Sequence, residues 1–154
     1  MEHRSLATCV SLLLLATHLT SCSTPPEERI RRCLANGARA VESGDRAAAA
    51  EAISADYRDE RGRDKAGVLA GLALLTRGRR IHVLLRIEEV RLGEPGRARA
   101  AVVAALAGRP AKDFGSLDDA WTDLYRLHLD LVEEGGIWRV RAASWTSIGV
   151  ADLF

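Results

Sequence analysis

The segment YRLHLDLVEEGGIWRV, residues 125–140, decides the fold of this 154-residue chain. Apolar residues occupy every second position in its first half, which predicts a strand with one buried face. Glu134-Gly135-Gly136 predicts a tight turn, since glycine readily adopts the backbone angles that turns require. The alternation then resumes, so the segment predicts an antiparallel hairpin. Its buried positions are Tyr125, Leu127, Leu129 and Leu131 before the turn, and Trp138, Val140 and Ala142 after it.

Two further strands are predicted before this hairpin. A long strand over residues 80–88 has alternating apolar positions, and Gly93-Glu94-Pro95-Gly96 is typical of a turn. Residues 97–107, rich in alanine and valine, predict the next strand. Residues 108–119 then read as a long loop, for which the sequence does not show whether it closes a pocket. The apolar positions of the first strand are Ile81, Val83, Leu85 and Ile87.

Three helices are predicted nearer the N-terminus. Thr24-Pro25-Pro26-Glu27 is a favourable start, with Thr24 as cap, and Gly44 ends this helix. Asp45 caps a second helix to about residue 54, and Asp64 caps a third that ends at Gly78, with residues 55–64 as a turn between them. Helices followed by an antiparallel meander predict an α+β domain in which helices cover one face of a single sheet. The inward positions are Ile30, Cys33, Leu34, Ala38 and Val41 in the first helix, and Ala47, Ala50 and Ile53 in the second.

The first residues have the pattern of an export signal. Residues 6–19 are largely apolar, but this run is shorter than the roughly 20 residues that span a bilayer. It ends in Leu19-Thr20-Ser21-Cys22, which resembles the lipobox of bacterial lipoprotein precursors. In that family a diacylglycerol is joined to the cysteine sulfur, and the signal is cut just before it. The alternative is an ordinary secretory signal with a chance cysteine.

The lipobox resemblance implies a division of the chain into three parts. Residues 1–21 would be a cleaved signal peptide, residues 22–26 a lipidated N-terminus with a short linker, and residues 27–154 the folded domain. Ser23 stands where an aspartate usually retains such lipoproteins at the inner membrane, so the periplasmic side of the outer membrane is the expected location. Cys33 is then the one free thiol, expected to be buried and structural.

The order of elements resembles the nuclear transport factor 2-like superfamily with its SnoaL-like members. The resemblance rests on three helices, the Tyr57-Arg58-Asp59 turn, and long strands that end in residues 134–140. Proteins of this superfamily fold as a cone, with helices closing over a bent antiparallel sheet around a pocket. They include ketosteroid isomerases, polyketide cyclases, dehydratases, transport factors and members without enzymatic function, so the fold alone does not assign an activity.

The strand pattern indicates a pocket without acid–base groups. His82 and His128 lie on the opposite parity from the apolar residues, as do Arg86, Glu88, Arg126, Asp130, Arg139 and Arg141, which predicts a solvated charged face. The inward hydroxyls would be those of Tyr125, Ser144 and Thr146. Asp56, Tyr57 and Asp59 are the remaining candidates for catalysis, although such a cluster more often caps a helix or pairs with arginine. The expected pocket lining is Tyr57, Leu72, Tyr125, Leu127 and Trp138.

Composition and motifs exclude several functional classes. The net charge is +1 from 22 basic and 21 acidic residues, which gives no reason to expect nucleic acid as a partner. No phosphate-binding glycine loop, zinc-ligand spacing or nucleophile elbow is present in the sequence, so we expect no cofactor and no metal.

Three functional hypotheses follow. The leading one is a non-enzymatic envelope lipoprotein, held at the membrane by Cys22, that binds a small apolar ligand or another envelope protein. The second is an isomerase, cyclase or dehydratase acting on a hydrophobic molecule, with Asp56 or Asp59 as base. The third is a structural homodimer formed through the charged sheet face.

Overall fold

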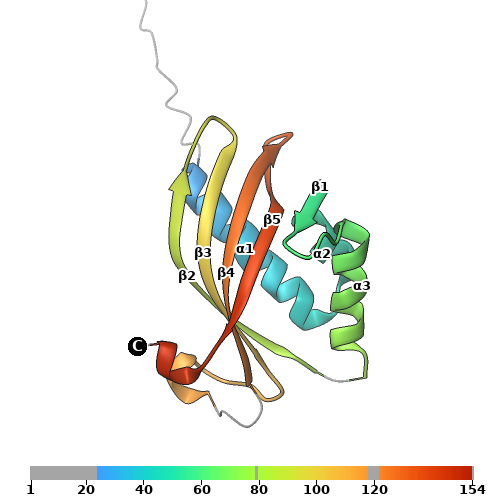
Figure 1. Ribbon diagram of the computed structural model, residues 1–154, viewed down its shortest axis with the longest axis vertical. Coiled ribbons are helices and arrows are strands. Elements are labelled where there is room, and N and C mark those ends of the chain that lie inside the picture. Colours follow the sequence, from blue (N-terminus) through green and yellow to red (C-terminus); the bar gives the residue numbers. More distant parts are fainter. Residues whose placement is uncertain (1–23, 79, 118–121, 154) are drawn as a thin grey trace, which may run out of the picture.

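The computed structural model describes residues 24–78, 80–117 and 122–153. The export signal, Cys22 and the last two residues of the predicted 108–119 loop lie outside these ranges. Figure 1 shows a sheet with one long helix behind it and shorter helices to one side. The elements are α1 (Pro26–Ser43), α2 (Arg46–Glu51), β1 (Ile53–Asp59), α3 (Lys65–Thr76), β2 (His82–Leu92), β3 (Arg97–Ala107), η1 (Phe114–Ser116), β4 (Thr122–Glu134), β5 (Ile137–Ile148) and η3 (Val150–Leu153).

The five strands form one sheet in the order β1-β5-β4-β3-β2. The four predicted strands pair antiparallel, as expected. The fifth strand, β1, was not predicted, because residues 55–64 were interpreted as a turn. It pairs parallel to β5, with Ile53 opposite Val140, so the sheet is mixed rather than purely antiparallel. Its buried positions, Ile53, Ser54, Tyr57 and Asp59, include polar residues, and this hides the alternation that marks a strand.

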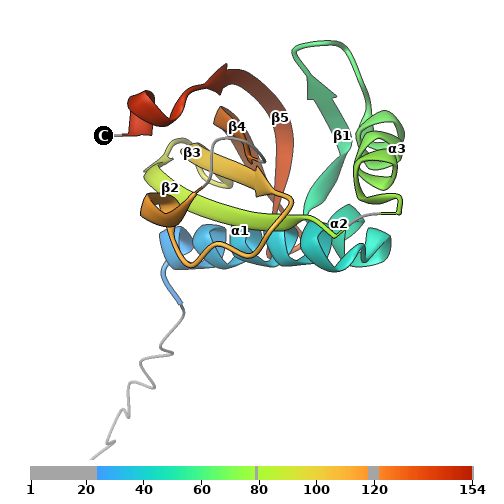
Figure 2. The same cartoon turned by 90° about the horizontal axis from the view of Figure 1, so that it is seen from below.

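Helix α1 covers one face of the sheet, which we call the inner face (Figure 2). Ile30 and Leu34 are spaced by one helical turn and are 0% and 7% exposed, so both lie against the strands. The helix ends at Gly44, whose φ of +70° suits glycine. The predicted Thr24 cap is wrong, since the N-cap position is Pro25 and no side chain caps the helix. The main core comprises Ile30, Leu34, Ala98, Ala100, Val102, Leu129, Leu131 and Trp138.

The shorter helices begin as predicted but end earlier. The Asp45 carboxylate accepts from Ala48 N–H at 3.0 Å, and the Asp64 carboxylate accepts from Gly67 N–H at 2.8 Å. Helix α2 ends at Glu51, where the chain turns into β1 instead of continuing to residue 54. Its buried side chain is Ala49, whereas the predicted inward residue Ala47 is exposed.

A β-bulge at Arg141 changes which residues of β5 face inward. Val140 pairs with Leu131 and Ala142 with Asp130, so Arg141 is an extra residue on β5. The alternation therefore reverses beyond this point. Ser144 lies opposite His128 and Thr146 opposite Arg126, which places both hydroxyls on the outer face and corrects the prediction. Trp145, opposite Leu127, takes the inner position.

The outer face is partly covered by the end of the chain. Leu153 is 5% exposed and packs with Val103 and Leu124 in a second, smaller core. Arg86 donates to Leu153 O at 3.3 Å, and Arg126 donates to Asp152 O at 3.2 Å. These two arginines were expected on a fully solvated face; instead they hold η3 against the sheet.

Candidate functional site

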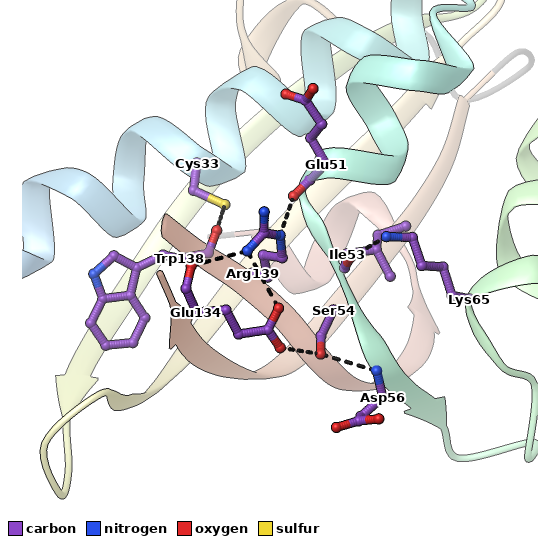
Figure 3. A network of polar contacts seen from close by, with 9 residues as sticks. All are labelled: Cys33, Glu51, Ile53, Ser54, Asp56, Lys65, Glu134, Trp138 and Arg139. Carbon is purple, nitrogen blue, oxygen red and sulfur yellow. Dashed lines mark hydrogen bonds and ion pairs between the residues drawn. The ribbon is translucent and has the colours of Figure 1, made fainter. Parts of the chain in front are cut away.

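A crevice runs along one side of α1 and is bounded by α2 and by the start of β5 (Figure 3 shows its polar contacts). Its volume of about 590 Å³ falls within the range of small-molecule sites. The α1 residues recur every three or four positions, so they lie along one flank of the helix. The lining residues are Arg29, Arg32, Cys33, Asn36, Arg39, Ala40 and Ser43 from α1, Asp45, Ala48, Glu51 and Ala52 from α2 and its ends, and Gly136, Ile137 and Trp138.

Polar contacts fix the walls of this crevice. Cys33 Sγ donates to Trp138 O at 3.0 Å, which ties α1 to β5. Arg139 donates from Nε to Glu51 O at 3.0 Å and from Nη1 to a Glu134 carboxylate oxygen at 3.3 Å, as Figure 3 shows. Arg139 therefore joins β5 to α2 and is half-buried, although the sequence predicted it on the solvated face. Fixed walls favour a preformed site over one assembled on binding.

The Cys33 thiol in the crevice is unreactive. Burial raises the pKa of Cys33, and the charge of Arg139 lowers it by less. The thiol is therefore protonated at neutral pH, whereas nucleophiles and metal ligands require the thiolate. Cys33 is half-buried and structural, in line with its place in the apolar stripe of α1.

Arginines provide most of the hydrogen-bond donors of the crevice. Arg29 pairs with Glu133 at 2.5 Å, and Arg32 pairs with Glu28 at 2.9 Å. Arg39 donates to the amide oxygen of Asn36 and has no carboxylate partner among the described residues. Its positive charge is therefore available to a ligand.

Two buried donors of lining residues have no hydrogen-bond partner. They are Nε of Arg29 and Nε1 of Trp138, and the Trp138 residue is only 4% exposed. Buried donors are nearly always paired, because an unpaired one costs on the order of 1–3 kcal/mol. Both atoms are closed to solvent, so they are unpaired groups inside the packed walls and not donors that the crevice presents to a ligand.

The predicted lining residues do not converge on one cavity. Trp138 lines the crevice, while Leu72 lines a recess of about 10 Å³ between α1, α2 and α3. Leu127 packs beside the main core and Tyr125 is half-buried on β4. Tyr57 is 3% exposed within β1. A ligand role for these five residues stays a prediction.

The Asp59 carboxylate serves structure. Its Oδ1 accepts from the backbone N–H groups of Arg61 and Arg63, both at 2.9 Å, and its Oδ2 accepts from Arg63 Nε at 2.7 Å. Burial alone would raise the pKa of Asp59, but these bonds and the Arg63 charge outweigh burial and lower it. A carboxylate so held is a weak base. Asp56, the other proposed base, is exposed on β1.

Neither histidine lines the crevice. His82 lies with Nδ1 at 2.9 Å from a Glu42 carboxylate oxygen, so it contacts the end of α1 instead of solvent alone. His128 is exposed on the outer face in a shallow groove of about 620 Å³. No group of three potential metal-binding side chains occurs among residues 24–78, 80–117 and 122–153, and no helix there is long and apolar enough to cross a bilayer.

The sequence interpretation missed the polar crevice residues of α1. Arg29, Asn36 and Arg39 were assigned to no site, although Arg29, Asn36 and Ser43 are spaced by seven residues along one flank of α1. The sequence does contain a signal for this site: these hydrogen-bond donors recur along one flank of α1, next to its apolar stripe. The α2 residues that line the crevice could not be identified from the sequence, because the chain turns from α2 into β1 and β1 was not predicted.

Comparisons with known proteins reveal the fold but no family. No family model matches the sequence, and no curated protein matches it. An NTF-2 like protein of unknown function from Shewanella oneidensis superimposes with a TM-score of 0.62 at 15% identity, over 79% of this chain and 98% of its own. An NTF2-like protein of unknown function from Pseudomonas putida gives a TM-score of 0.58 at 17% identity, over 80% and 87%.

A third solved structure is similar to the same degree. It is an uncharacterized protein with a cystatin-like fold from Caulobacter vibrioides, with a TM-score of 0.62 at 19% identity over 80% of this chain and 89% of its own. Sequence identities this low support a shared fold but not a shared activity. The chain therefore has the nuclear transport factor 2-like fold, as the order of its elements predicted.

Proposed function

We propose that this protein is a membrane-anchored envelope lipoprotein whose domain binds a small ligand, or a segment of another envelope protein, without converting it chemically. Lipid on Cys22 would hold the mature chain at the membrane, on the periplasmic side of the outer membrane. Several acyl chains anchor a protein firmly where one does so only marginally. The apolar run and the lipobox in the first 22 residues support this part of the proposal.

The crevice beside α1 carries the binding part of the proposal. It combines a volume of about 590 Å³, apolar lining residues and several donors. The apolar residues include Ala40, Ala48 and Ala52, and among the donors Arg39 has no carboxylate partner in the part of the chain that the structure describes. A ligand with an apolar body and acceptor oxygens matches this lining.

Two ionisable residues of the crevice have structural roles. Among its ionisable residues, Cys33 is held protonated by burial. Asp45 is engaged in capping α2. The carboxylate that the second hypothesis uses as base, Asp59, is saturated by three hydrogen bonds at the far end of β1. Replacing Asp56 and Asp59 by asparagine tests the enzyme directly, since a general base is needed for turnover and an unchanged rate or phenotype in that variant would contradict it.

Native mass spectrometry of the detergent-extracted mature protein tests the proposal. We expect lipid mass on Cys22, which Cys22→Ser removes, and a retained small molecule. Ala48→Leu fills the crevice and should release the retained molecule, because Ala48 lines it. Ala47→Leu is the matched control, since Ala47 lies next to it on α2 but is exposed and outside the crevice.

Each part of the proposal has its own contradicting result. Absence of lipid mass from the mature protein would refute the anchor. Equal retention in the Ala48→Leu and Ala47→Leu variants would refute the crevice as the binding site. The same spectra give the oligomeric state, and a dimer that salt does not dissociate would contradict pairing through the charged outer face.

A further inference from the structure

The end of the domain at which α1 begins also carries the turns of two hairpins. Arg29 Nη1, in the first turn of α1, donates to Gly136 O at 3.4 Å. Glu133 N–H donates to Gly96 O at 2.9 Å, which joins the two hairpin turns. Figure 1 shows the turns and the start of α1 at one end of the molecule, opposite η3. We call residues 92–97 and 135–137, together with the first turn of α1, the tip.

Exposed apolar side chains gather at the tip. Three large apolar side chains are exposed in the part of the chain that the structure describes, and two of them are Leu92 and Ile137, at 44% and 54%. The third, Leu74 at 62%, is on α3. Single exposed apolar residues are ordinary, but two of these three lie at the turns of the two hairpins, at the end of the domain where α1 begins.

The chain leaves little room between this tip and a lipidated Cys22. Pro26, the first residue of α1, follows Cys22 by four positions, so an extended linker spans at most roughly 14 Å. Helix α1 has 18 residues and is about 27 Å long. Helix α3 packs against the opposite end of α1, near Ala40 and Gly44, so Leu74 lies far from the anchor.

Charge at the tip does not favour anionic headgroups. Two basic residues and three acidic ones belong to the tip, so its charge is nearly balanced and attraction to an anionic surface is not the source of contact. The basic residues are Arg29 and Arg97, and the acidic ones are Glu27, Glu28 and Glu94.

We propose that the tip faces the lipid bilayer and that Leu92 and Ile137 enter its interfacial layer. This inference rests on the proposed lipid anchor of Cys22. Two aliphatic side chains are too few to hold a domain on a membrane from solution, but a tethered domain is already concentrated there. Their burial therefore sets the orientation of the domain, with α1 rising away from the membrane.

Fluorescence quenching of the mature lipidated protein on phosphatidylcholine vesicles tests this orientation. An environment-sensitive label is attached to Leu92→Cys, Ile137→Cys or, as matched control, Leu74→Cys. Cys33→Ser in all three removes the native thiol and keeps a donor to Trp138 O. We expect a lipid-borne nitroxide to quench the labels at 92 and 137 at least about twofold more than the label at 74, since interfacial side chains lie about 5–10 Å into the bilayer.

Hydrogen exchange of the unsubstituted protein gives a second measurement without labels. Amides of residues 93, 94, 96, 135 and 136 should exchange more slowly on vesicles than in the soluble Cys22→Ser protein. Equal quenching at all three labels, or none at 92 and 137 while the protein remains on the vesicles, would overturn the orientation and leave the anchor standing. Loss of the protein from the vesicles together with an unmodified Cys22 would instead overturn the anchor, and this inference with it.

Discussion

Helices α1 and α3 differ in how their apolar residues relate to burial. Helix α1 mixes charged and apolar residues, and buries Ile30, Leu34 and Ala40 along one stripe. Helix α3 is apolar almost throughout and buries none of its 12 residues; its Leu74 is 62% exposed. α1 lies across the sheet, whereas α3 contacts β1, α2 and the end of α1. The spacing of apolar residues, and not their number, therefore determines which helix forms the core.

Replacing one side chain of each helix by alanine should show most clearly how differently α1 and α3 contribute to stability. Ile30→Ala removes a fully buried side chain from the main core, and we expect a loss of about 3 kcal/mol in the free energy of unfolding. Leu72→Ala on α3 is half-buried and should cost about 1 kcal/mol. Urea denaturation of both variants measures the difference, and equal losses would contradict the comparison.

The junction between β1 and α3 depends on the Asp59 carboxylate. Asp59→Asn removes its charge and an acceptor for Arg63, and should destabilise the protein by about 2 kcal/mol at pH 7. The pKa of Asp59 is lowered in the folded state, so its stabilisation is complete above the ordinary aspartate value of about 3.9 and is lost as pH falls through the folded pKa. The difference in the free energy of unfolding between wild type and variant should therefore become smaller in acid. A gap of the same size at pH 7 and pH 2 would contradict this assignment.

The N-terminal caps should matter more for α3 than for α1. Asp64→Ala removes the acceptor for Gly67 N–H and should cost about 1 kcal/mol, because α3 has no buried side chain to hold it otherwise. Thr24→Ala should change stability by less than about 0.5 kcal/mol, since Thr24 caps nothing. Thermal unfolding of the two variants checks the contrast.

Most of the fold could be predicted from local patterns. The predicted strand over residues 97–107 coincides with β3, and both glycine-containing turns lie where expected. These elements follow from period-2 alternation and from turn chemistry, which depend on near neighbours in sequence. β1 could not be read in this way, because Ser54 and Asp59 are buried and polar, and their partners come from Glu134 and Arg63.

The candidate site was harder to predict for a related reason. Only Trp138 of the five expected lining residues borders the crevice. The parity argument fails beyond Arg141, where one extra residue exchanges the faces of Ser144 and Trp145. A bulge leaves no local mark in a sequence of alternating small residues, and the crevice itself is formed by α1, α2 and β5, whose approach is a tertiary property.

The ionisation of Tyr57 tests how firmly β1 is enclosed between α3 and the rest of the sheet. Burial, and then the Asp59 charge, raise the pKa of Tyr57 to about 12, although Arg63 lowers it. The protonated form is favoured in the folded state, so the stability that this shift contributes is present below about pH 10 and is lost as pH rises through about 12. The chain has two tyrosines, so an absorbance titration of tyrosinate should show one ionising near pH 12, and Tyr57→Phe should remove that step. If Tyr57→Phe instead removes an absorbance step at the ordinary tyrosine pKa of about 10, the α3 side of β1 opens to water.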